Sequence, residues 1–187
     1  HPHRGFETVT IVYDGEVAHR DSTGQGGVIG PGDVQWMTAG SGILHEEFHS
    51  PDFTARGGPL EMAQLWVNLP ARSKMTAPGY QAITASQIPT VDLPRGAGTV
   101  RVIAGELADA KGPARTFTPI NVRDLRLNAG SRVVLQANEG WALLLPVLRG
   151  SVRIADAAAQ SGQVVVMSRS GGAVTVEAVE DSRLLWL

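Results

Sequence analysis

Short apolar runs alternate with turn signals along the whole chain. Asp14-Gly15, the Gly30–Asp33 run and Ser170-Gly171-Gly172 are typical turn sequences because Gly, Pro and Asp favour the backbone angles that turns require. Many short apolar runs separated by turns predict an all-β sandwich or barrel. The expected strands are residues 7–13, 34–37, 64–69, 100–104, 132–135, 141–148, 152–155, 164–168, 173–178 and 183–187. Helix signals are few, and residues 83–88 could form one turn that Pro89 ends.

The same order of motifs occurs twice in the chain. Residues 5–17 read Gly-Phe, an apolar run and Gly-Glu-Val, and residues 140–152 read Gly-Trp, an apolar run and Gly-Ser-Val. Residues 31–37 and 161–167 then match in the same order. An internal repeat predicts two similar β-domains. We place them at residues 1–75 and 115–187, with residues 76–114 as a linker that includes connecting strands.

The charge, the cysteine count and the length of the apolar runs exclude several classes of function. The net charge of −2 carries no basic footprint for nucleic acid. The absence of Cys excludes disulfides, thiolate metal sites and a Cys nucleophile. No apolar run approaches the roughly 20 residues that cross a bilayer, and no signal peptide is visible. We therefore expect a cytoplasmic protein, and its 14 Arg against 2 Lys indicate a bacterial gene.

The candidate chemistry lies in the first quarter of the chain, because all five His fall within residues 1–49. His1 and His3 are two residues apart, so on a strand their side chains share a face about 6.8 Å apart. His45 and Glu47 repeat this spacing. Three imidazoles and one carboxylate suit Fe, Mn, Co, Ni, Cu or Zn. Such a set leaves positions open on an ion that prefers six ligands, which favours a catalytic over a structural site.

The remaining candidates are weaker. His19 and His49 have no ligand-type partner on the same face, so we expect them to be exposed or to support the ligands. Glu7 follows the face of His1 and His3 and is either a further ligand or an acceptor that orients an imidazole. We favour the acceptor role because Glu47 already supplies a carboxylate. Trp66 is expected in the core.

Three stretches of the chain carry a recognisable signature. Residues 1–9 read His-Pro-His-Arg-Gly-Phe-Glu-Thr-Val, residues 32–47 end in His-Glu-Glu, and residues 65–70 read Leu-Trp-Val-Asn-Leu-Pro. These motifs resemble those of the pirin family. The similarity is weaker but collinear to the end of the chain. Pirins are bicupins, so the resemblance implies two cupin-type antiparallel β-barrels whose terminal pieces lie partly outside this chain.

The resemblance also implies a site. The metal would be held in the first barrel by the residues that match His1, His3, His45 and Glu47, without Glu7. The second barrel would lack ligands, since Gln136 and Asn138 stand where the repeat would place His1 and His3.

Two functions follow from the resemblance. Pirin-like proteins include quercetin 2,3-dioxygenases, which open a flavonol ring with O₂; Glu47 would accept the proton of the flavonol hydroxyl, and the cofactor would be Fe(II) or another of the ions above. Other pirins are iron-dependent redox sensors that bind transcription factors or metabolic enzymes. A zinc-dependent cupin isomerase or epimerase is a third reading, disfavoured because no cationic cluster for a sugar phosphate is visible. We expect a monomer that binds no nucleic acid or membrane.

Overall fold

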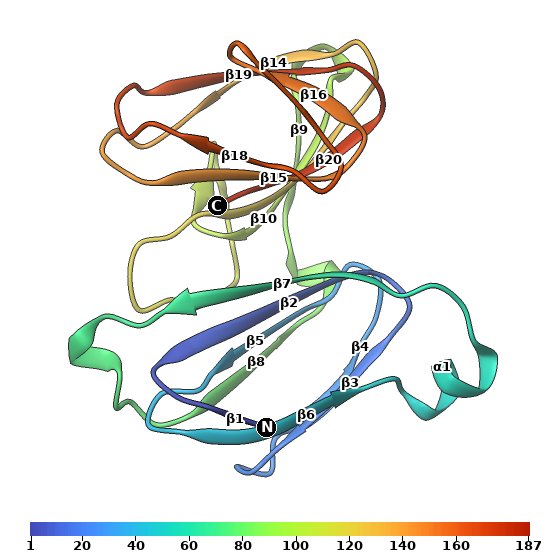
Figure 1. The fold of residues 1–187 in the computed structure, drawn as a ribbon, viewed down its shortest axis with the longest axis vertical. Coiled ribbons are helices and arrows are strands. Elements are labelled where there is room, and N and C mark those ends of the chain that lie inside the picture. The colour runs from blue at the N-terminus through green and yellow to red at the C-terminus, as the bar shows by residue number, and fades with distance from the viewer. The chain divides into compact units, whose positions relative to one another are not determined.

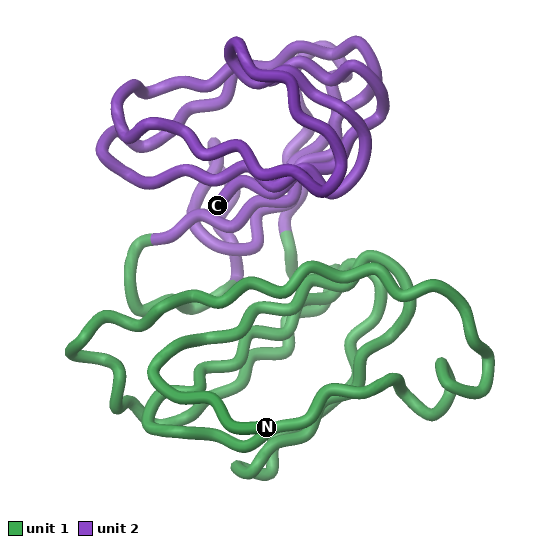
Figure 2. Tube along the Cα trace, in the orientation of Figure 1, with its two compact units in different colours: residues 1–88, 114–119 green, residues 89–113, 120–187 purple.

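The chain folds into two compact β units. The computed structural model describes residues 1–187, of which 53% lie in strands and 8% in helices. Unit 1 comprises residues 1–88 and 114–119, and unit 2 comprises residues 89–113 and 120–187 (Figure 2). The expected all-β fold is confirmed. None of the helices has the length and apolar character needed to cross a membrane.

Unit 1 is built from two four-stranded antiparallel sheets, with the strand orders β1-β6-β3-β4 and β7-β2-β5-β8. Figure 1 shows the two sheets facing each other as the walls of a barrel. Its elements are β1 (Pro2–His3), β2 (Phe6–Asp14), β3 (Val17–Asp21), β4 (Gly26–Ile29), β5 (Val34–Thr38), β6 (Ile43–Phe48), α1 (Pro51–Arg56), β7 (Glu61–Asn68), η1 (Ala71–Ser73), β8 (Gly79–Ile83) and η2 (Ala85–Gln87).

The one α-helix of unit 1 was not expected, although its signals stand in the sequence. Ser50 is the N-cap and its hydroxyl accepts from the backbone N–H of Phe53 at 3.0 Å. Pro51 occupies the first turn, where its missing N–H costs nothing, and Gly57 ends the helix. At six residues, the helix is too short to show an amphipathic period.

Unit 2 contains the sheet β14-β19-β16-β17, the sheet β18-β15-β20-β13-β10-β9 and the small pair β11-β12. Its elements are β9 (Thr90–Asp92), η3 (Pro94–Gly96), β10 (Gly98–Ala104), β11 (Glu106–Leu107), β12 (Ala110–Lys111), β13 (Val122–Leu127), β14 (Arg132–Gln136), β15 (Leu143–Arg149), β16 (Ser151–Ile154), β17 (Ala157–Gln160), β18 (Val164–Met167), β19 (Ala173–Ala178) and β20 (Ser182–Trp186). One large apolar cluster, which includes Leu125, Leu145, Leu184 and Trp186, fills this unit.

The internal repeat is visible in the topology of the two units. The order β14-β19-β16-β17 repeats β1-β6-β3-β4, and β18-β15-β20 repeats β5-β2-β7. The repeated glycines also share their backbone conformation, which is the left-handed one that glycine adopts at no steric cost. Their φ angles are 78° and 84° at Gly5 and Gly140, 77° and 81° at Gly15 and Gly150, and 89° and 86° at Gly32 and Gly162.

The boundaries between the units differ from those expected at residues 75 and 115. Residues 76–88 belong to unit 1, because β8 pairs with β5. Residues 89–113 belong to unit 2, because β9 and β10 extend the sheet that contains β13. Residues 114–119 return to unit 1, where the side-chain amide of Gln81 pairs with the backbone of Arg115. The segment 76–114 is thus shared between both units, since strand pairing over long sequence separations decides membership.

Two of the glycines in unit 2 allow a matched stability prediction. A Cβ at Gly150 would lie 2.5 Å from the carbonyl oxygen of Asp181, whereas a Cβ at Gly162 would meet nothing within 4 Å. Gly162→Ala should therefore lower the free energy of unfolding by about 1–2 kcal/mol, the cost of the left-handed conformation. Gly150→Ala should cost about 1–3 kcal/mol more, because the strand must also move. Urea denaturation of the two variants measures this difference, and equal losses would contradict the close approach.

Candidate metal centre

Pairing of β1 with β6 brings three histidines together. The register places His3 opposite Ile43, and the backbone N–H of His45 donates to the carbonyl of His1 at 3.1 Å. The Nε2 atom of His1 lies 2.9 Å from that of His3 and 3.0 Å from that of His45. Three imidazole nitrogens therefore converge on one point.

The spacing of these nitrogens fits a transition metal ion. With bonds of about 2.1 Å, two ligands at right angles lie about 3.0 Å apart. Burial lowers the pKa of the His3 and His45 imidazoles, although the charge of Glu47 acts in the opposite direction. The unprotonated form that binds a metal is thereby favoured.

Glu47 lies beside this triad, on the side of His45. It shares the inward face of β6 with His45, as the two-residue spacing predicts. One ligand atom each of His19, His45 and Glu47 lies within 4.8 Å of the others, and the same holds for His1, His3 and His45. These two groups are the two clusters of the site, and His45 belongs to both. The carboxylate accepts from Gln35 Nε2 at 3.0 Å and Gln64 Nε2 at 2.8 Å, which holds it in one orientation. Neither glutamine was singled out from the sequence, because they lie on β5 and β7, strands whose pairing with the rest of the barrel the local sequence does not reveal.

His19 is part of the site and is not exposed, contrary to one of the two expectations for it. Only 3% of it is accessible, and its Nδ1 lies 3.4 Å from Nδ1 of His45. Its Nε2 lies 3.0 Å from Asp21 Oδ2. Burial opposes ionisation of Asp21, but hydrogen bonds from Thr23 and His19 hold the pKa of Asp21 below its usual value. His49, by contrast, is exposed and contacts the ring of Phe53 away from both clusters.

Glu7 does not share the face of His1 and His3. Strand β2 begins after Gly5, whose φ of 78° turns the chain and interrupts the alternation between β1 and β2. Glu7 lies opposite Thr38, whose hydroxyl donates to it at 2.7 Å, and belongs to neither cluster. Burial raises the pKa of the Glu7 carboxyl, although its hydrogen bond from Thr38 acts in the opposite direction.

The position of Glu7 predicts that Glu7→Gln leaves metal binding unchanged. The amide keeps an oxygen that can accept from Thr38, and no group near the histidines is altered. The measurement is the metal content of the purified variant after reconstitution, compared with that of the unaltered protein. A loss of more than about half of the bound metal would give Glu7 the role of an outer partner or ligand.

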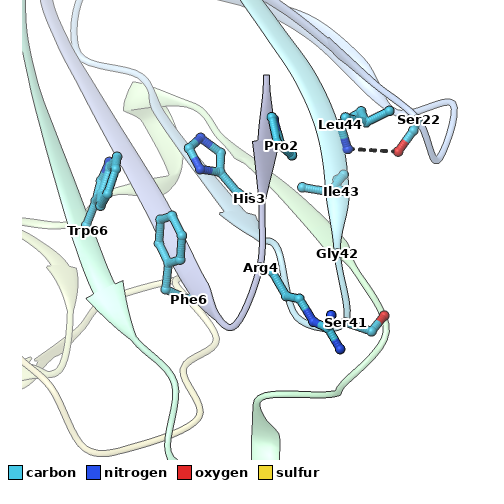
Figure 3. Close-up of a pocket in the computed structure, with 10 residues that line it drawn as sticks. All are labelled: Pro2, His3, Arg4, Phe6, Ser22, Ser41, Gly42, Ile43, Leu44 and Trp66. Atoms are coloured by element: carbon cyan, nitrogen blue, oxygen red, sulfur yellow. Dashed lines mark hydrogen bonds between the residues drawn. The ribbon is translucent and has the colours of Figure 1, made fainter.

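An open hollow of about 650 Å³ lies next to the histidines, and His3, Arg4, Phe6, Leu44 and Trp66 contribute to its lining. Figure 3 shows the rings of His3, Phe6 and Trp66 on one side of β1, with Leu44 on the other. The ring of Trp66 lies 4.7 Å from Phe6 and 5.5 Å from His3. Trp66 is 66% exposed, so the expectation that it packs in the core is wrong.

Trp66 is exposed because it is on the same side of β7 as Gln64, which reaches Glu47, and this side opens to the hollow. Strand alternation alone does not tell which face of a strand is covered.

The interior of the second barrel has apolar residues where the first has polar ones. The repeat places Leu145 where unit 1 has Thr10, and Ile154 where it has His19. His19 pairs with Glu47, and the equivalent pair in unit 2 is Ile154 with Val176. Both clusters of metal-ligating side chains accordingly lie in unit 1.

Comparison with known proteins places the chain in a family. The model of the Pirin family matches residues 1–67, which include both clusters. The Pseudomonas aeruginosa protein PA2418, provisionally named a quercetin 2,3-dioxygenase, is 53% identical over all 187 residues, and a pirin-like protein of Caulobacter vibrioides is 43% identical over 189. The chain belongs to the pirin family.

A solved structure has the same fold over the whole chain. The crystal structure of a quercetin 2,3-dioxygenase from Acinetobacter baumannii superposes with a TM-score of 0.96 at 54% identity, and covers 100% of this chain. The chain spans 65% of that protein, 65% of the Pseudomonas protein and 66% of the Caulobacter protein. The expected family and the cupin-type fold of this pirin are thereby confirmed.

Proposed function

We propose that this pirin is a metal-dependent dioxygenase that opens a flavonol or a related enol ring with O₂. The observation that carries the proposal is the convergence of three Nε2 atoms, of His1, His3 and His45, beside the fixed carboxylate of Glu47. The names of the Pseudomonas and Acinetobacter relatives support this reaction class.

His1, His3, His45 and Glu47 would hold the ion, and we propose Fe(II) because a mixed imidazole and carboxylate set with open positions is typical of iron oxygenases. The ion, when bound, would supply a Lewis acid that lowers the pKa of the substrate hydroxyl and a site at which O₂ is activated.

The protein groups around the ion would bind the substrate and take up its proton. Phe6 and Trp66 present aromatic rings at the hollow, against which a planar flavonol can stack. Glu47 would accept the hydroxyl proton as a general base, while Gln35 and Gln64 keep its oxygens in place. The hollow is open, which suits a substrate of three rings such as a flavonol.

Quercetin turnover tests the proposal. Metal-free protein would be reconstituted separately with Fe(II), Mn(II), Co(II), Ni(II) and Cu(II) and incubated with quercetin in air. We expect loss of the flavonol absorbance together with O₂ uptake and release of carbon monoxide, in proportion to bound metal. Absence of all three signals with every ion would contradict the proposal and favour the regulatory alternative, in which the metal state changes binding to a protein partner.

A further inference from the structure

A buried chain of hydrogen-bonding groups runs from Asp21 through His19 to His45. Asp21 Oδ2 lies 3.0 Å from His19 Nε2, and His19 Nδ1 lies 3.4 Å from His45 Nδ1. The side chains of Asp21 and His19 are both fully buried, and the ring of Tyr80 stacks on His19 at 5.0 Å. The contacts of His19 with His45 and Tyr80 were not predicted from the sequence, since they join β3 with β6 and β8. The Asp21–His19 pair lies two residues apart on β3 and was not recognised either.

The contacts of His19 determine which of its nitrogens carries the proton. An ionised carboxylate only accepts hydrogen bonds, so His19 must present Nε2–H to Asp21. Its Nδ1 then has a lone pair and can only accept. Gln35 Nε2, at 3.4 Å from this Nδ1, agrees with that assignment, because an amide nitrogen only donates.

The orientation of the Gln35 amide is fixed independently. The hydroxyl of Tyr80 donates to Gln35 Oε1 at 3.2 Å, and Gln35 Nε2 donates to Glu47 Oε1 at 3.0 Å. The amide nitrogen therefore faces both Glu47 and His19, and the assignment of His19 follows from partners on either side of its ring.

We propose that Asp21 and His19 are positioning residues that set the tautomer of His45. Because His19 Nδ1 accepts, His45 must donate from its own Nδ1, and its Nε2 is left with a free lone pair. That Nε2 is the atom that points to His1 and His3, at 3.0 Å from His1 Nε2. In the opposite tautomer, an N–H bond would point into the triad and obstruct an ion.

The same network explains why His19 is not itself a ligand in this proposal. Asp21 engages its Nε2, and Gln35 and His45 share its Nδ1. His19 thus links the imidazole of His45 with the carboxylate of Glu47 through Gln35. This inference rests on the proposed function only in taking His45 as a metal ligand.

The first test reads the tautomers directly in the metal-free protein. Long-range ¹H–¹⁵N correlation spectra above the pH at which the histidines titrate distinguish protonated from unprotonated ring nitrogens. We expect His19 to carry its proton on Nε2 and His45 on Nδ1. A proton on Nδ1 of His19 or on Nε2 of His45 would overturn the proposal, whatever the protein's affinity for metal.

The second test is Asp21→Asn, which should reverse the chain of donors. Asp21 Oδ1 accepts from the backbone of Thr23 at 2.8 Å and of Gln25 at 3.3 Å, so the amide oxygen should stay on that side. The amide nitrogen then faces His19 Nε2, which must accept. His19 would donate from Nδ1, giving up its hydrogen bond from Gln35 Nε2, and His45 would carry its proton on Nε2.

The expected consequence of Asp21→Asn is a loss of about 10- to 100-fold in affinity for Co²⁺, used as the probe, together with exchange of both tautomers in the spectra. Glu46→Gln is the matched control. It removes one negative charge next to His45, but Glu46 is on the outer face of β6, paired with Arg20. The control should bind Co²⁺ like the unaltered protein.

Unchanged tautomers in folded Asp21→Asn protein would overturn the proposal. If the variant does not fold, the spectra of the unaltered protein still decide. A protein with the expected tautomers and no dioxygenase activity would contradict the proposed function alone.

Discussion

His45→Ala protein is expected to lose its stoichiometric metal. His45 belongs to both clusters, is buried, and supplies the Nε2 atom that lies 3.0 Å from that of His1. Alanine removes a ligand, so the affinity should fall by more than the roughly 10- to 100-fold that loss of an outer partner costs. We expect about one ion per chain in the unaltered protein and a small fraction of this in the variant, measured by elemental analysis after reconstitution and dialysis.

His49→Ala is the matched control for this prediction, because His49 lies close in sequence but is exposed and outside both clusters. It should bind one ion per chain. Full metal content in folded His45→Ala protein would show that the assigned ligands are wrong. A second tightly bound ion in the unaltered protein would contradict the apolar interior assigned to unit 2.

Glu47→Gln should have the largest effect on turnover. The amide is nearly isosteric but cannot accept the substrate proton, and loss of a general base typically costs about 10²- to 10⁴-fold in rate. Both oxygens of Glu47 accept hydrogen bonds from amide nitrogens, those of Gln35 and Gln64. In the variant, the new amide nitrogen would face one of these donors, and that hydrogen bond would be lost. The side chain at position 47 would therefore lose its fixed orientation as well as its negative charge.

The rate of quercetin cleavage must be expressed per bound ion, because the substitution is also expected to lower metal occupancy. Glu46→Gln, on the outward face of the same strand, controls for the loss of charge. A Glu47→Gln protein with a rate per ion within about threefold of the unaltered one could not use Glu47 as its base.

Local patterns in the sequence were enough for the fold class and the internal repeat. Each of the ten expected strands overlaps an observed strand, because alternation and turn residues act over a few neighbouring positions. Gly15 and Gly150 adopt the same left-handed conformation, which favours glycine at both positions. The repeat could therefore be recognised from the sequence. The His45 and Glu47 pair shares one face for the same local reason.

Local patterns failed where the chain turns or where only one face of a strand is covered. The alternation that linked Glu7 to His3 is interrupted at Gly5, so extending the count across it gave the wrong face. Trp66 is a large apolar residue of the type that usually packs in a core, but its side of β7 opens to the hollow. The expected boundaries at residues 75 and 115 differ because strand pairing, which joins distant segments, decides the units.

The sequence by itself determined that this chain is a repeated β fold with two ligand-type pairs near its start. Only the tertiary structure decided how those pairs meet and what surrounds them. His19, Gln35 and Gln64 come from three different strands, and their contacts with His45 and Glu47 depend on sheet register and on two sheets facing each other. Register is set by pairing over long sequence separations, so no local pattern carries it.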